Sequence, residues 1–273
     1  PPPRSATTHA GTLPPPSPRA TLHPLAAHRS PRAQEPIDPD LPICDAHHHF
    51  WSRPAGAWDG MRKQLHMGDR MQTHYMLEEL GADIKACGHN IVDTVYEECN
   101  SHYRTDGPPS HASLGETTFA QQCADANAIP GTNVAAGIVG SVDLLELGAA
   151  SGAVLREHIA AAPNFRGIRF AHAFDPELGS THGRSSADVL SDPSFRAGFS
   201  CLAELGLTFD AWGFFHQLEP VAALANDYPD VQIILNHAGG PLGLGSYREK
   251  QPQVMEEWKK GIAAVSQCRN VNG

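Results

Sequence analysis

Several features that would identify a protein class at once are missing from this sequence. No stretch of its 273 residues approaches the roughly 18 apolar residues of a membrane-spanning helix. The six cysteines are scattered from Cys44 to Cys268 without a C-x-x-C pair, so no disulfide framework is indicated. Together these absences predict a soluble, intracellular protein, with the cytoplasm as its compartment and no membrane partner.

Positive charge is also scarce. The chain carries 20 Lys and Arg against 30 Asp and Glu, a formal net charge of −10. This balance argues against a nucleic-acid partner, because a phosphate backbone attracts basic surfaces. Hydrophobic residues make up 41% of the chain, which is typical of a globular protein with a sizeable core. A small-molecule substrate is the partner that fits; the sequence does not set the oligomeric state.

Residues 1–40 differ in composition from the rest. They are rich in Pro, Ser, Thr and Ala, and up to residue 34 their only full charges are Arg4, Arg19, Arg29 and Arg32. Prolines block helices and sheet ladders, and there are too few large apolar residues for a core, so we expect a disordered N-terminal segment. An arginine-rich segment without acids also suits an organelle transit peptide. Residues 41–273 form the predicted folded domain.

From Leu41 onward, strand-like and helix-like patterns alternate. Short runs rich in Val, Ile and Phe predict buried parallel strands at Pro42–Asp45, Asn90–Tyr96, Asn133–Val139, Phe165–Phe170, Leu207–Phe209 and Val231–Leu235. The clearest helix is DPSFRAGFSCLAELG, with Asp192 as the N-cap and Gly206 just past the end. A second helix is predicted in QPQVMEEWKKGIAAVSQ, from Gln251.

A strand followed by a helix every 30 to 40 residues predicts a parallel α/β fold. No G-x-G-x-x-G turn follows the first strand, which argues against a doubly wound dinucleotide-binding sheet. A (β/α)8 TIM barrel needs about 250 residues. Six strands are counted and Asn270–Gly273 resembles the opening of a seventh, so we expect a (β/α)8 barrel that is truncated before strand 8.

Histidines follow the first predicted strand. His47, His48 and His49 come directly after the run PICDA. Side chains alternate along a strand, so His47 and His49 point to one side and His48 to the other. In a parallel barrel this end of the strands carries the chemistry, and an imidazole pair suits Zn²⁺ or a similar cation. With 16 histidines in the chain, a chance cluster is the alternative.

Another histidine follows the last long strand. The run VQIILNHAGGPLG ends in His237, followed by Gly239 and Gly240. The two glycines allow a sharp turn and a close approach of the backbone. A lone histidine after a strand is usually structural, but two strand-terminal histidine sites in one alternating chain favour a pocket.

The runs DAHHHFW, RGIRF, LTFDAW and IILNHAGGP resemble the amidohydrolase superfamily, in particular its amidohydrolase-related branch of sugar lactonases and 2-pyrone-4,6-dicarboxylate lactonase. The resemblance covers the chain from about Leu41 and implies a (β/α)8 barrel and a hydrolase. It implies His47, His49 and His237 as ligands of a divalent metal, most simply Zn²⁺. In lactonase-type relatives these histidines polarise the substrate carbonyl without tight metal, so a metal is not strictly required. His237 is the implied catalytic residue.

Two departures from the family pattern affect this interpretation. The metal-dependent pattern has a histidine at the end of strand five, where this chain has Asp210 and Trp212, and His216 follows only later. The family's general-base aspartate belongs to strand eight, which we do not find. The chain as given is therefore expected to bind metal weakly and to lack its base.

Other residues are candidates for binding the substrate. Arg169 lies near the end of the fourth strand and could hold a substrate carboxylate or ring oxygen, or form a surface or inter-strand ion pair. Trp51 and Trp212 could stack on a ring, or pack in the interior. Glu97 and Glu98 could orient a histidine or be solvated, and His172 is expected in a loop. Pro108–Thr117 is predicted to be a loop over the site.

The leading functional prediction is a hydrolase that opens a lactone or similar cyclic ester by attack of water. One alternative keeps the fold and metal but makes the protein a decarboxylase; this reaction uses the strand-five histidine that is missing here. Another alternative is a catalytically inactive remnant or binding protein, which the missing eighth strand favours.

Overall fold

The computed structural model describes residues 36–57, 59, 72–180, 186–243 and 245–273. Of the predicted N-terminal segment, only residues 36–40 fall in this range, and they form exposed bends and turns before the first strand. The predictions of disorder and of a transit peptide for residues 1–35 lie outside the described residues.

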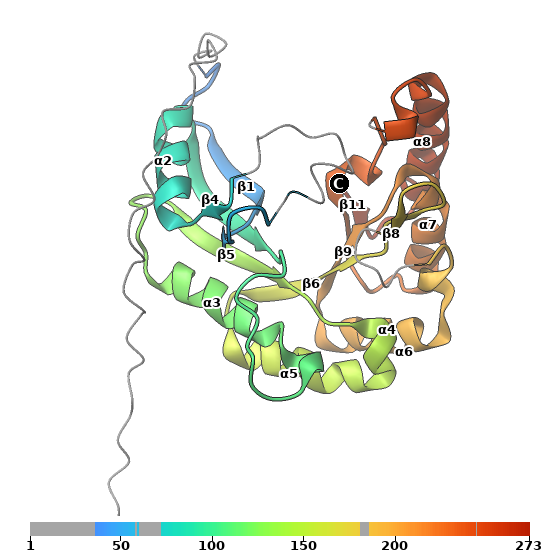
Figure 1. Cartoon of the computed structure of the whole chain (residues 1–273), viewed down its shortest axis with the longest axis horizontal. Coiled ribbons are helices and arrows are strands. Elements are labelled where there is room, and N and C mark those ends of the chain that lie inside the picture. The colour runs from blue at the N-terminus through green and yellow to red at the C-terminus, as the bar shows by residue number, and fades with distance from the viewer. Residues whose placement is uncertain (1–35, 58, 60–71, 181–185, 244) are drawn as a thin grey trace, which may run out of the picture. The chain divides into compact units, whose positions relative to one another are not determined.

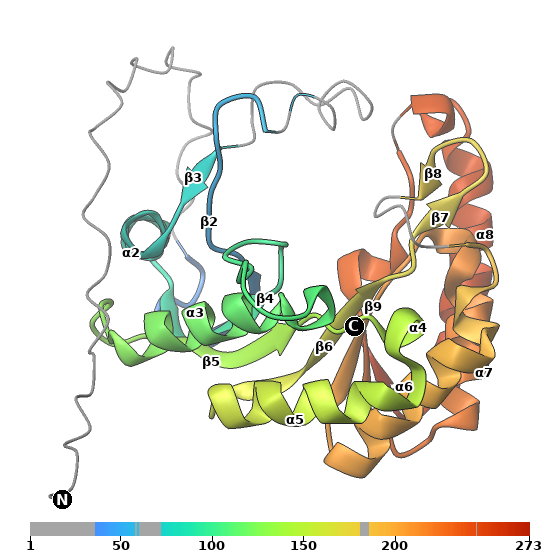
Figure 2. The same cartoon turned by 60° about the horizontal axis from the view of Figure 1, so that its bottom comes forward.

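Seven parallel strands form the main sheet. In spatial order, which is also chain order, they are β1 (Pro42–His48), β4 (Asn90–Glu97), β5 (Asn133–Gly140), β6 (Phe165–Ala171), β9 (Thr208–Trp212), β10 (Ile233–Leu235) and β11 (Val271–Asn272). Every neighbouring pair is parallel. The sheet curls, with β1 and β4 toward one side and β9 and β11 toward the other (Figures 1 and 2). This arrangement confirms the predicted barrel class, with seven strands in the described residues.

Two strands run further than the sequence indicates. β1 continues from Asp45 to His48, and β9 continues from Phe209 to Trp212. The apolar pattern stops early in both, but backbone pairing continues, with Asp45 opposite Thr94 and His48 opposite Tyr96. Ladder hydrogen bonds do not require apolar side chains. The polar residues are therefore the last residues of the strands themselves, and backbone pairing fixes their positions.

Helices cover the convex side of the sheet (Figure 2). They are α2 (Leu77–Cys87), α3 (Leu114–Asp125), α4 (Leu144–Leu147), α5 (Ser151–Ala161), α6 (Pro193–Leu205), α7 (Leu218–Asp227) and α8 (Gln251–Val265). The caps predicted for α6 are confirmed: Asp192 accepts hydrogen bonds from the Ser194 and Phe195 amides, and Gly206 has φ 65°. Helices therefore lie between successive strands of the main sheet, as in a barrel.

Two short antiparallel pairs lie in the loops: β2 (Trp51–Ser52) with β3 (His74–Tyr75), and β7 (Phe174–Asp175) with β8 (Gly179–Ser180). Two residues per strand are too few to give a periodic signal, so the sequence did not predict them. The loop predicted at Pro108–Thr117 is wrong in its second half, because α3 begins at Leu114.

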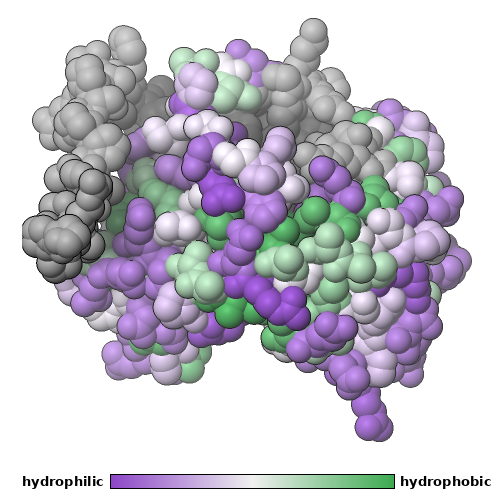
Figure 3. Space-filling model, turned by 90° about the horizontal axis from the view of Figure 1, so that it is seen from below, coloured by the Kyte–Doolittle hydropathy of each residue, from purple (hydrophilic) through white to green (hydrophobic). Residues whose placement is uncertain are grey.

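The core lies between the sheet and its helices. Phe195 and Phe199 of α6 pack edge to face against Phe209 of β9, and all three are fully buried. The face drawn in Figure 3 is mostly hydrophilic, with hydrophobic residues in a band across its middle. No helix in the described part of the chain is long and apolar enough to cross a membrane. All six cysteines are free, and Cys44 and Cys87 are exposed rather than buried.

The contact between β6 and β9 depends on a glycine. A Cβ atom at Gly167 would lie 2.1 Å from Thr208 Oγ1 and 2.4 Å from the Thr208 carbonyl oxygen. Backbone cannot move away cheaply, so we expect Gly167→Ala to lower the free energy of unfolding by about 1–3 kcal/mol. Gly137 on β5 is the matched control, since its Cβ would come no closer than 3.6 Å to Val95. Equal losses for the two variants in urea denaturation would contradict this account.

Candidate active site

The three consecutive histidines divide between the two faces of β1. His48 points outward, where its Nε2 lies 2.8 Å from Thr94 Oγ1 and its ring packs against Phe50 and Tyr96. His47 and His49 lie on the other side, with ring centroids 4.9 Å apart. The alternation predicted for this segment is therefore present, and His48 is a structural residue.

His237 follows β10, near the other end of the strand order, and lies beside this pair. Its ring centroid lies 5.0 Å from that of His47. The two residues are 190 positions apart in sequence, and the curl of the sheet brings their strand ends together. We refer to His47, His49 and His237 as the histidine cluster. The sequence predicted this set of side chains, and the structure brings all three together.

The turn that carries His237 is strained and fixed from both sides. His237 and Ala238 have φ values of 51° and 52°, a region that side chains other than glycine rarely adopt. Asn236 donates a 2.9 Å hydrogen bond to Asp210 Oδ2, and the Trp258 indole donates a 2.7 Å bond to the Ala238 carbonyl. Strain that the surrounding structure maintains is characteristic of functional sites.

Arg169 reaches the cluster from β6. Its Nη1 lies 3.4 Å from His47 Nε2, and its guanidinium lies 5.4 Å from the centre of the Trp212 ring. The side chain is 5% exposed and its Nε donates a 2.9 Å hydrogen bond to Glu98 Oε1. Arg169 forms an ion pair with Glu98, which is one of its two predicted roles. This buried pair is part of the wall of the site.

Two buried carboxyl groups stand behind Arg169. Glu97 and Asp210 are 1% and 2% exposed, which rules out the solvated alternative for Glu97. Burial, reinforced by the Asp210 carboxylate, raises the pKa of Glu97 to about 10. Burial also raises the pKa of Asp210. Two adjacent buried carboxylates repel each other, which favours protonation of one of the pair.

The histidines of the cluster are neutral at physiological pH. Burial, with neighbouring cations and imidazoles, lowers the pKa of His47 to about 3, and burial lowers that of His49 to about 4. Burial and Arg169 also lower the pKa of His237. His49 Nδ1 lies 2.7 Å from the Glu97 carbonyl oxygen, and a carbonyl only accepts. His49 therefore carries its proton on Nδ1 and has a lone pair on Nε2.

The remaining predicted residues fall around the cluster or away from it. Trp51 stacks on His49 at 5.6 Å, and Trp212 meets His237 edge-on at 5.6 Å. His216 is not part of the cluster, since its Nε2 donates to the Phe174 carbonyl. His172 follows β6 as expected but is 1% exposed, and neither ring nitrogen has a hydrogen-bond partner among the described residues.

A buried acid that the sequence did not reveal organises the loop after β4. Glu116 of α3 accepts hydrogen bonds from the Tyr96 hydroxyl at 2.9 Å and from the Cys99 and Ser101 amides at 2.8 and 3.1 Å. This loop contains two residues with positive φ, Asn100 and His102. Glu116 falls in the Pro108–Thr117 segment that was predicted to be a loop, and the structure places it in the first turn of α3.

Replacing Glu116 changes how stability depends on pH. Burial raises the pKa of Glu116 from 4.5 to about 7, so the folded protein retains a proton that the unfolded chain releases between these values. The contribution of this retained proton to the free energy of unfolding is thus complete below pH 4.5 and is lost as the pH rises through 7. Glu116→Gln stays neutral, so its stability relative to wild type should rise by on the order of 2 kcal/mol from pH 5 to pH 8. Denaturation at both values tests this, with exposed Glu78→Gln as the control; parallel profiles would contradict it.

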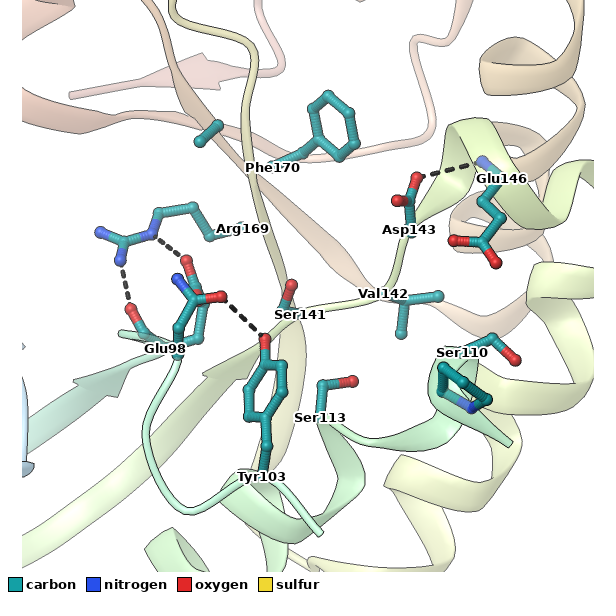
Figure 4. Close-up of a pocket in the computed structure, with 13 residues that line it drawn as sticks. Glu98, Tyr103, Ser110, Ser113, Ser141, Val142, Asp143, Glu146, Arg169 and Phe170 are labelled. Carbon is teal, nitrogen blue, oxygen red and sulfur yellow. Dashed lines mark hydrogen bonds and ion pairs between the residues drawn. The ribbon is translucent and has the colours of Figure 1, made fainter. Parts of the chain in front are cut away.

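A polar hollow of about 180 Å³ adjoins the cluster. Loops after β4 and β5 and the end of β6 line it, and Arg169 belongs both to its wall and to the surroundings of His47. Figure 4 shows Arg169 and Glu98 on one side and Asp143 and Glu146 on the other. We call it the Arg169 pocket. Its position at the carboxyl ends of three parallel strands is where barrel enzymes bind substrates.

The predicted metal ligands do not form a ready coordination site. Across residues 36–57, 59, 72–180, 186–243 and 245–273, no group of three or more His, Cys, Asp or Glu side chains could hold a metal ion. The Arg169 guanidinium lies against His47 Nε2, where it occupies a lone pair and repels a cation. The arrangement therefore fits hydrogen bonding to a substrate better than it fits a tightly bound metal.

Parallel strands with helical cover and a polar cluster at their carboxyl ends are the arrangement of a barrel enzyme. Residues 44–272 match the Amidohydrolase family model, so the chain belongs to the amidohydrolase family. It is 32% identical to the uncharacterized protein y4mH of Sinorhizobium fredii, over 85% of this chain and 71% of the relative. The family match identifies the chain as a hydrolase and leaves its substrate open.

Solved structures confirm the fold. A crystal structure of an amidohydrolase from Burkholderia multivorans with bound HEPES superposes with a TM-score of 0.58 at 20% identity, covering 84% of this chain and 67% of that one. A second crystal form of an amidohydrolase from the same organism, with bound zinc, gives 0.57 at 20% identity and the same coverage. At this identity the likeness establishes the barrel architecture alone.

Proposed function

We propose that the protein opens a lactone or a similar cyclic ester by hydrolysis. The observation that carries this proposal is the convergence of three neutral imidazoles on a buried guanidinium, at the carboxyl ends of the strands. Neutral imidazoles both donate and accept hydrogen bonds. Such a set can polarise a carbonyl and handle the proton of an attacking water, and ester hydrolysis requires both actions.

His237 and Arg169 supply the donors in this proposal. Arg169 keeps N–H groups beyond those that it donates to Glu98 and His47. Within the described residues no hydrogen bond engages the His237 ring. Both side chains therefore have donors for the lactone carbonyl oxygen, which gains negative charge when water attacks the carbonyl carbon. Preorganised donors of this kind stabilise that charge without reorganisation.

His49 is the proposed proton acceptor. Its bond to the Glu97 carbonyl leaves the Nε2 lone pair directed away from the backbone. In the proposed reaction the water oxygen bonds to the carbonyl carbon while its proton passes to Nε2. The ring C–O bond then breaks, and the departing oxygen takes that proton to give the hydroxy acid. A pKa of about 4 keeps His49 unprotonated over the physiological range.

We propose that this reaction proceeds without a tightly bound metal. The Arg169 guanidinium lies against His47 Nε2, which disfavours a cation there, and a lactone carbonyl is activated enough for hydrogen bonds to suffice. Zinc is bound in one Burkholderia multivorans relative; among the described residues of this chain, no group of three His, Cys, Asp or Glu side chains could hold such an ion.

A panel of five- and six-membered lactones tests the proposal. Acid release is followed with a pH indicator, against an enzyme-free blank, before and after treatment with a chelator. We expect opening of at least one lactone and retention of most of the rate after metal removal. If no lactone is opened while a carboxylated substrate releases CO₂, the decarboxylase alternative replaces this proposal.

A further inference from the structure

The turn after β10 is held by a buried hydrogen bond that the proposed reaction does not use. Asn236 follows β10 directly, and its Nδ2 donates a 2.9 Å hydrogen bond to Asp210 Oδ2 on the neighbouring strand β9. The two residues are 4% and 2% exposed. Among the described residues, Asn236 Oδ1 has no hydrogen-bond partner. The bond to Asp210 is therefore the restraint that this part of the chain places on the Asn236 amide.

A restraint is needed here because the next two residues adopt an unfavourable backbone conformation. His237 and Ala238 have φ values of 51° and 52°, where the Cβ atom of an L-residue crowds the following carbonyl oxygen. β10 has only three residues, and its pairing with β9 ends at Leu235, before the turn. Without a side-chain restraint the backbone would relax toward negative φ. That change would turn the His237 ring away from His47, whose ring centroid lies 5.0 Å from it.

Asp210 is well placed to supply this restraint because it lies between two strands of the site. In the sheet register it is opposite Arg169 of β6 on one side, and it faces β10 on the other. Side chains alternate along a strand, so Asp210 shares a face of β9 with Trp212, whose ring lies 5.6 Å from that of His237. Neither Asp210 nor Asn236 is among the described residues that line the Arg169 pocket. This placement suits support of the site rather than contact with the substrate.

We propose that Asp210 is a positioning residue, which acts through Asn236 to hold the His237 imidazole where it meets the substrate carbonyl. The catalytic use of His237 rests on the proposed function, whereas the orientation of its ring does not. Loss of the hydrogen bond should slow the chemical step, since a group displaced by about 1 Å can cost about 10²-fold in rate. Binding should change less, because the donor matters most when negative charge develops on the carbonyl oxygen.

Exchanging the two side chains tests this proposal. Asn236→Asp places two acceptors face to face, and Asn236→Leu removes the donor without adding charge. In the double variant Asp210→Asn/Asn236→Asp, donor and acceptor trade places and the total charge is that of wild type. We expect each single variant to lower kcat for an opened lactone by about 10- to 100-fold, with KM within about threefold of wild type. The exchange variant should recover kcat to within about threefold of wild type.

Long-range ¹H–¹⁵N NMR spectra of the imidazoles report on the ring independently of turnover. The His237 signals should shift in both single variants and return toward their wild-type positions in the exchange variant, while outward-facing His48 stays unchanged. Asn133→Asp is the matched control, because Asn133 donates a 2.8 Å hydrogen bond to Asp93 between β5 and β4, where β5 begins. Its replacement should change neither kcat nor the His237 signals.

The possible outcomes separate positioning from stability. Wild-type kcat in Asn236→Leu, or His237 signals that do not move in it, overturns the proposal. An exchange variant that melts like wild type but stays as slow as Asn236→Asp also overturns it, because the bond would then serve stability alone. If the single variants do not fold, the exchange variant decides: wild-type kcat and His237 signals support the proposal, and their loss, or failure of this variant to fold, contradicts it.

Failure of the proposed function is recognised separately. If the wild type opens no lactone of the panel, the proposed function has failed. The His237 signals then decide alone whether Asp210 positions the ring, since they do not depend on turnover.

Discussion

Replacing His237 with asparagine is expected to lower kcat for lactone opening by about 10²–10³, the usual effect of removing one donor to a developing oxyanion. Asparagine is the informative substitution because His237 has φ 51°, and asparagine tolerates that conformation better than alanine does. The backbone of the turn, held by Asn236 and Trp258, should then remain in place. Only the imidazole is lost.

Measurements of kcat, KM and melting temperature together test this prediction. The melting temperature should change little, since the His237 ring is only partly buried. His74→Asn is the control, because His74 is exposed on β3 and outside the cluster. A His237→Asn variant that folds normally and turns over at the wild-type rate would remove His237 from the catalytic machinery.

Replacing Arg169 with methionine is expected to destabilise the fold by about 3–5 kcal/mol at pH 8, as is usual when one partner of a buried ion pair is removed. The lost cation is paired with Glu98 and lies near Glu97 and Asp210. All three acids are almost fully buried, so water cannot replace the guanidinium. The loss should shrink at pH 5, because uncompensated carboxylates take up protons.

An exposed ion pair provides the control for Arg169. Arg196 pairs with Asp227 at the surface, where the two side chains are 29% and 55% exposed. Arg196→Met should cost less than about 1 kcal/mol, since solvent screens exposed pairs. Similar losses for the two variants, or a loss for Arg169→Met that does not depend on pH, would mean that Arg169 does not compensate buried charge.

Much of the fold follows from local patterns. The apolar runs predicted six of the seven strands of the main sheet, and Asp192 and Gly206 predicted both ends of α6. The position of His47, His49 and His237 could be anticipated because the carboxyl ends of parallel strands meet at one edge. These signals are strong because each depends on residues that are close in sequence.

The charges around the histidines could not be predicted in this way. Whether Glu97 and Asp210 share a proton depends on contacts between β4 and β9, which are over 100 residues apart. Glu116 lies in a segment that was predicted to be a loop, and its role depends on the Cys99 and Ser101 amides of another loop, 17 and 15 residues away. The length of β1 was underestimated because the pattern ends at Asp45 and the backbone pairing does not.

The central claim is that the histidine cluster holds neutral imidazoles and receives a lactone carbonyl. Long-range ¹H–¹⁵N NMR spectra of the imidazoles at pH 7, with and without a hydrolysis-resistant lactam, test it most directly. The account predicts that His47 and His49 are neutral with the proton on Nδ1, and that the lactam shifts His49 and His237 but leaves outward-facing His48 unchanged. Imidazoles that titrate near pH 6.5, or a lactam that shifts none of the three cluster residues, would contradict it.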